Sequence, residues 1–223
     1  MACRLYGYMT EPSSSRFLSW RRNNVRGLVT KAGVVEDSAV KSPTCPGFPI
    51  RATVISLIIY EAIVNEYRVT KYDPALRGSN GEYKGDDWTS ITQIGQSFRG
   101  VVLTDQEYKR VEHAYIKSAL AFLSESGISA LRVEGLENSR RQPLKCEEGS
   151  VLTLEQIPDV IGRILGEDFW CRLQADNGFV HFGWDYYMYI GVPIRCLAAE
   201  QIATELGLFV EEFASPYHEN PGN

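Results

Sequence analysis

The histidine whose neighbours best suggest chemistry is His181, which lies in the aromatic run FVHFGWDYYMYIGV. Along an extended strand every second side chain points to the same face, so His181 would share a face with Asp185 and Tyr187. An imidazole beside a carboxylate and a phenol could host a general base and the group that orients it. The same stripe could instead be structural or bind a partner, and we favour that second interpretation.

Two adjacent carboxylates, Asp86 and Asp87, form another candidate site just before Trp88. Clustered carboxylates could bind a metal ion, but Asp-Asp followed by Trp-Thr-Ser is more typical of a cap at the start of a turn or short helix. His113 is expected on the polar face of a helix, and His218 lies in the C-terminal tail. Neither histidine is assigned a role.

Sequence motifs of common enzyme classes are missing from the chain. There is no P-loop, no G-x-G-x-x-G after a strand, no G-x-S-x-G and no H-E-x-x-H. The 5 cysteines include no C-x-x-C pair, and none lies at a zinc-ligand spacing from a histidine. We therefore expect no catalytic centre, no metal site and no cofactor. Scattered thiols fit a reducing compartment, which predicts a cytoplasmic protein.

The elements that would position these residues predict an α+β domain over residues 64–223. The expected strands cover 66–72, 128–136, 169–175, 179–192 and 208–213, and the expected helices cover 105–126, 158–165 and 194–206. Asn177-Gly178 between two aromatic, β-branched runs predicts a β-hairpin. We expect a mixed, largely antiparallel sheet packed against a long central helix, with a C-terminal hairpin and helix.

The long helix has clear start and stop signals. Thr104 and Glu107 have the spacing of a capping box, and Gly127 is placed to end the helix. The apolar residues of the helix fall on one stripe, so we expect a sheet to cover that stripe.

Residues 1–63 differ from the rest and are predicted to be a poorly defined extension. They are rich in Arg and Ser and contain the helix-breaking stretch SPTCPGFP. The apolar run at 52–64 is shorter than the ~20 residues that a membrane-spanning helix needs, so a buried strand or short helix is expected there. The extension could also be an organelle transit peptide, or Val64 could be the native start.

The charge of the chain is divided unevenly. Residues 1–63 hold 8 Lys and Arg against 4 Asp and Glu, whereas residues 64–223 hold 15 against 24, a net charge of −9. A basic footprint for nucleic acid is therefore missing, and a basic protein partner is expected rather than nucleic acid or a membrane. A negative surface also keeps many proteins soluble.

Four segments together carry a resemblance to a known group of proteins: YRVTKYDPALRGSNGEYKGDDWTSITQIG, VEHAYIKSALAFL, HFGWDYYMYIGV and GLFVEEFASPY. In the order of these segments and in their local sequence, residues 64–217 resemble small bacterial immunity proteins of polymorphic-toxin and contact-dependent inhibition systems. The resemblance implies a non-enzymatic protein that binds a cognate toxin, often a nuclease, and blocks its active site. It carries over no functional positions.

The candidate partner-binding residues are mainly acidic and aromatic side chains in the 78–88 loop and in the 179–192 run. Acidic side chains would attract a basic partner, and aromatic side chains would anchor it. They are Glu82, Asp86, Asp87, Trp88, His181, Trp184, Asp185 and Tyr187. Trp88 could equally pack beneath its loop. The alternative functions are a small-molecule enzyme that uses His181, Asp185 and Tyr187, or a regulatory interaction module.

Overall fold

The computed structural model describes residues 65–183 and 185–218. The predictions for the 1–63 extension and for the apolar run at 52–64 concern residues outside the described part, and they stay predictions. The chain divides into two compact units, and only Ser79–Glu82 of the smaller unit is described.

The larger unit has the predicted α+β fold. Its seven-stranded sheet has the order β5-β4-β6-β7-β8-β1-β9, and each neighbouring pair is antiparallel. The strands are β1 (Asn65–Thr70), β4 (Ala130–Glu137), β5 (Val151–Thr153), β6 (Trp170–Ala175), β7 (Gly178–Phe182), β8 (Met188–Val192) and β9 (Phe209–Glu212). The N-terminal strand thus pairs with two C-terminal strands, a long-range connection that local sequence patterns do not encode.

Three α-helices accompany the sheet: α2 (Asp105–Glu125), α3 (Ile157–Leu165) and α4 (Leu197–Glu205). The Thr104 side chain accepts a hydrogen bond from the Glu107 N–H at 3.1 Å, as predicted for the helix start. The Glu107 carboxylate binds Arg110 at 2.8 Å. Gly127 has a φ of 76°, which lets the chain reverse and the Ile128 N–H bond the Leu123 carbonyl at 2.9 Å.

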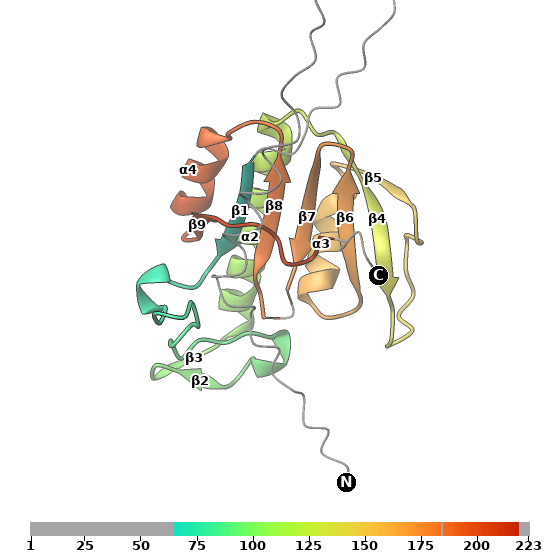
Figure 1. Cartoon of the computed structure of the whole chain (residues 1–223). Coiled ribbons are helices and arrows are strands. Elements are labelled where there is room, and N and C mark those ends of the chain that lie inside the picture. Colours follow the sequence, from blue (N-terminus) through green and yellow to red (C-terminus); the bar gives the residue numbers. More distant parts are fainter. Residues whose placement is uncertain (1–64, 184, 219–223) are drawn as a thin grey trace, which may run out of the picture. The chain divides into compact units, whose positions relative to one another are not determined.

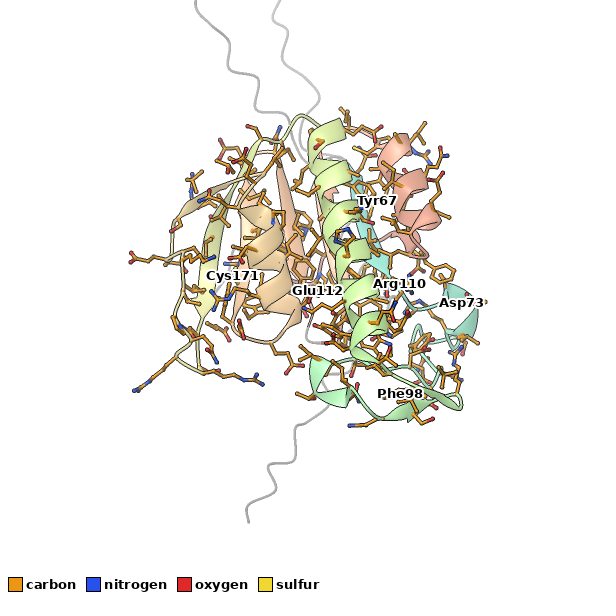
Figure 2. All side chains as sticks on the ribbon, turned by 180° about the vertical axis from the view of Figure 1, so that it is seen from behind. Tyr67, Asp73, Phe98, Arg110, Glu112 and Cys171 are labelled. Carbon is orange, nitrogen blue, oxygen red and sulfur yellow. The ribbon has the colours of Figure 1, made fainter. Side chains whose placement is uncertain are left out.

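Helices α2 and α3 cover one face of the sheet (Figure 2). The buried stripe of α2 includes Tyr108, Tyr115 and Phe122, and the Phe122 ring lies 5.1 Å from that of Tyr67 on β1. The segment that follows β9, residues 213–218, crosses the opposite face (Figure 1). We call it the C-terminal segment. Its Ser215 N–H donates to Glu66 on β1 at 2.9 Å.

The single strand predicted over 179–192 is wrong, because this run forms two antiparallel strands, β7 and β8, with a tight turn between them. The Gly183 N–H donates to the Tyr187 carbonyl at 2.8 Å, and Tyr186 in the turn has a φ of 66°. Every residue of both strands is buried. Buried strands lack polar alternation, so the hairpin was hidden in one apolar run.

Shorter elements occupy the connection between β1 and α2. They are the 3-10 turns η1 (Pro74–Leu76) and η2 (Ile91–Gln93) and the hairpin strands β2 (Ser97–Phe98) and β3 (Val101–Val102). No helix in the described part of the chain is both long enough and apolar enough to cross a membrane.

Candidate functional site

His181 is completely buried on β7, beneath the C-terminal segment. Its Nδ1 lies 2.8 Å from the Ser215 hydroxyl, and its Nε2 lies 2.9 Å from the Gln174 amide. The Phe179 ring stacks on the imidazole with the ring centroids 4.2 Å apart. Both ring nitrogens thus have uncharged hydrogen-bond partners within the protein.

Burial, with smaller contributions from the nearby His218 and Arg172, lowers the pKa of His181 from 6.5 to about 3. The imidazole is therefore neutral near pH 7. A buried histidine with so low a pKa is a weak base, because catalysis at neutral pH favours a pKa close to the working pH. This geometry favours a structural role, in which His181 fastens the C-terminal segment to the sheet.

The three residues of the predicted stripe do not form one stripe along a strand. His181 lies opposite Tyr189 in the β7–β8 hairpin, and Asp185 lies exposed in the turn. The backbone carbonyl of Asp185 accepts a hydrogen bond from the Tyr72 hydroxyl at 2.7 Å. Tyr187 is 5% exposed, and its hydroxyl accepts from Arg77 at 3.0 Å. Trp184 lies outside the described residues.

The two predicted carboxylates face the β2–β3 hairpin. Asp86 is exposed and accepts from the backbone N–H of Arg99 at 3.1 Å. Asp87 forms an ion pair with the Arg99 guanidinium at 2.6 Å and a short hydrogen bond with Tyr83. The expectation that these aspartates cap the next helix is wrong, since Ser90 caps η2. A hydroxyl directly before the turn reaches its free N–H groups better than the earlier carboxylates do.

Glu82 is exposed, and its carboxylate accepts from the Asn80 amide at 2.9 Å. Trp88 is 7% exposed and packs on Tyr108 and Tyr186, with ring centroids 5.5 and 4.9 Å away. The structure therefore has the arrangement in which Trp88 packs beneath its loop. In this conformation the indole is not an exposed anchor.

A cavity of about 130 Å³ lies beside Trp88, between the end of β1, the N-terminal part of α2 and the turn after α4. It is lined by Lys71, Asp87, Trp88, Glu107, Arg110, Val111, Leu206, Gly207 and Leu208. Figure 2 labels Arg110 on α2. Of the predicted partner-binding residues, Asp87 and Trp88 are brought together here.

Lys71 is the chemically distinctive residue of this cavity. Its Nζ lies 4.1 Å from the ring centroids of both Tyr72 and Trp88. Desolvation lowers the pKa of the ammonium to about 7, against the opposing attraction of Asp87 and Glu107. A lysine of this kind is partly neutral, and so nucleophilic, at pH 7.

Lys71 was not predicted from the sequence, although a signal was present. β1 is buried from Tyr67 to Thr70, and Lys71 follows directly, in the two-residue phase of the buried Tyr67 and Val69. A lysine in the buried phase of a strand is uncommon and points to a special environment.

A second feature missed from the sequence is a group of exposed apolar side chains on and next to α4 and β9. Ile194 precedes α4, Leu197 and Ile202 lie on it, and Phe209 begins β9; they are 47%, 62%, 39% and 37% exposed. We call it the α4–β9 surface. Glu205 and Glu212 are exposed on the same two elements.

Within residues 65–183 and 185–218, no His, Cys, Asp and Glu side chains gather in a group that could hold a metal ion. Comparison of the chain with protein-family models, with curated proteins and with solved structures returned no match. The function must therefore be argued from the surfaces and cavities of the chain itself.

Proposed function

We propose that the chain is an immunity-type protein of the cytoplasm that binds a basic toxin domain, such as a nuclease, and blocks its active site. The observation that carries the proposal is a group of exposed apolar side chains, with exposed carboxylates on the same elements, in an acidic domain. Residues 64–223 have a net charge of −9, and Glu205 on α4 and Glu212 on β9 are exposed on the elements that carry the α4–β9 surface. The expected partner is a protein, not nucleic acid or a membrane.

The two properties contribute differently to binding. An acidic surface attracts a basic partner over a distance and mainly raises the association rate. Apolar side chains that become buried at the centre of an interface supply most of the affinity. Leu197 is the most exposed of the four apolar residues, so it is the anchor that we expect to matter most. This surface takes the anchoring role first predicted for Trp88 and Tyr187, which are buried.

The environment of His181 supports binding over the alternative of an enzyme that uses His181, Asp185 and Tyr187. The imidazole is completely buried and its pKa is about 3, while Asp185 lies in the turn after β7. A regulatory module with another partner would use the same surface, and the experiment below separates it from an immunity protein.

The proposal predicts that the reading frame beside the gene for this chain encodes a domain that is toxic alone and tolerated when both proteins are expressed together. Growth of cells that express the neighbouring domain, with and without the chain, is the measurement. A harmless neighbour, or toxicity that the chain does not relieve, would contradict the immunity function.

A matched pair of variants tests the surface. Leu197→Gln removes an apolar anchor at the start of α4, where a polar residue is compatible with the helix, and should weaken toxin binding about tenfold, or ~1.4 kcal/mol. Val151→Gln makes the same change at the 61% exposed Val151 on β5, the opposite edge strand, and should leave binding unchanged. Titration calorimetry measures both affinities. Equal affinities would remove the α4–β9 surface from the proposal.

A further inference from the structure

The cavity beside Trp88 holds a lysine whose amino group contacts aromatic rings but donates no hydrogen bond to a described residue. Nζ of Lys71 lies over the faces of Tyr72 and Trp88, and no described residue accepts a hydrogen bond from it. The backbone of Lys71 is held firmly, since its N–H donates to the buried Tyr115 hydroxyl at 2.8 Å. The side chain thus extends from a held backbone, and Lys71 lines the cavity.

We infer that this cavity is a covalent binding site in which the Lys71 amine condenses with a small aldehyde. The space of about 130 Å³ is below the roughly 300–1,000 Å³ of ordinary ligand pockets, so the aldehyde has only a few heavy atoms. This site is separate from the proposed toxin-binding surface, and neither depends on the other.

The condensation balances without an added oxidant or reductant. The nitrogen lone pair attacks the carbonyl carbon and forms a C–N bond, while the electrons of the C=O π bond move to oxygen, which takes a proton. The resulting carbinolamine then loses its hydroxyl as water, and a C=N bond forms. One amine and one aldehyde thus give one imine and one water.

The surroundings of Nζ suit a protonated imine better than an ammonium. An ammonium has three N–H groups to satisfy, and no described residue accepts a hydrogen bond from Nζ, so only water and the ring faces are left for them. A protonated imine carries a single N–H and is less costly to desolvate. Its positive charge is stabilised by the same aromatic faces and by the negative charge of Asp87 and Glu107 on the cavity wall.

The charged groups around the cavity also keep the amine reactive. Burial is the main cause of its lowered pKa, Arg99 of the β2–β3 turn lowers it further, and Asp87 and Glu107 oppose this effect. The Arg110 guanidinium binds Glu107 through two 2.8 Å contacts, and its hydrogen bonds hold the pKa of that carboxyl below its usual range. The turn after α4 adds residues 206–208, none of them charged.

The experiment uses the full chain, propionaldehyde as the probe and cyanoborohydride to trap the imine as a stable secondary amine. Peptide mass spectrometry then measures the rate of modification at each lysine across a range of pH. Lys117, exposed on α2, is the internal control. At about pH 7 Lys71 should react roughly tenfold faster than Lys117, because far more of its amine is neutral. Its rate should level off above about pH 8, because the Lys71 amine is then almost entirely neutral.

Two further measurements keep the test decisive. Glu107→Gln removes one of the opposing negative charges, so the midpoint of the Lys71 pH profile should move to lower pH while Lys117 is unaffected. Lys71→Arg should fold, as checked by thermal unfolding, and should leave only the slow labelling of exposed lysines. A Lys71 rate equal to that of Lys117 at about pH 7, or a Lys71 rate that keeps rising well above pH 8, would overturn the inference.

Discussion

Acid should destabilise the protein through His181. The folded state keeps this imidazole neutral down to about pH 3, whereas in the unfolded chain it titrates at its ordinary pKa of 6.5. Below that pKa the unfolded state binds a proton that the folded state does not, so stability falls as the pH falls. From about pH 7.5 to about pH 5 the difference amounts to about 2 kcal/mol, since each unit below the unfolded pKa is worth ~1.4 kcal/mol.

The assay is urea unfolding at a series of pH values, with wild type compared with His181→Gln. The variant should be less stable at neutral pH, because its side chain fills the site less well, but it should lose about 2 kcal/mol less on acidification. His218, which lies 2.9 Å from Glu66, is present in both proteins. His113→Gln, at an exposed position on α2, is the control and should follow wild type. Parallel pH dependences for wild type and His181→Gln would refute the reasoning.

Two further predictions concern the packing of the sheet. Tyr115→Phe should lower the free energy of unfolding, measured with urea, by about 2–3 kcal/mol. The Tyr115 hydroxyl accepts from the Lys71 N–H at 2.8 Å and donates to the Tyr186 carbonyl at 2.7 Å, and both hydrogen bonds would be lost. A loss below ~0.5 kcal/mol would contradict this prediction. Gly191→Ala should lower the free energy of unfolding by about 1–3 kcal/mol, since a Cβ there would lie 2.2 Å from the Phe179 ring. The control, Gly162→Ala, has no neighbour nearer than 3.8 Å and should be neutral or stabilising. Equal effects of the two variants would refute this prediction.

Local patterns predicted the elements whose signals lie within a few residues. The helix α2 has a capping Thr104, a regular apolar stripe and Gly127 at its end, and all three follow from backbone geometry alone. The β6–β7 hairpin was likewise predicted from Asn177-Gly178. In each case the residues that determine the structure are neighbours in the sequence.

Features that depend on distant residues could not be predicted. His181 looked like an available base because nothing nearby in the sequence shows that Ser215 will cover it. Asp87 looked like a cap because its partner, Arg99, comes from the next hairpin. The environment of Lys71 depends on the turn after α4, which follows more than a hundred residues later. Tertiary contacts decide the chemistry of all three side chains.

The coverage of both sheet faces explains which polar residues are left for function. Helices take one face, and the C-terminal segment with its aromatic neighbours takes much of the other, so polar groups there are satisfied internally (Figure 1). Arg68, which is 4% exposed, illustrates this, because its guanidinium is held by Glu211 and stacks 4.1 Å over the Phe213 ring. Groups that remain accessible to a ligand or partner lie beyond the helices and the C-terminal segment. Those places are the Lys71 cavity beside the end of β1 and the α4–β9 surface at the sheet edge.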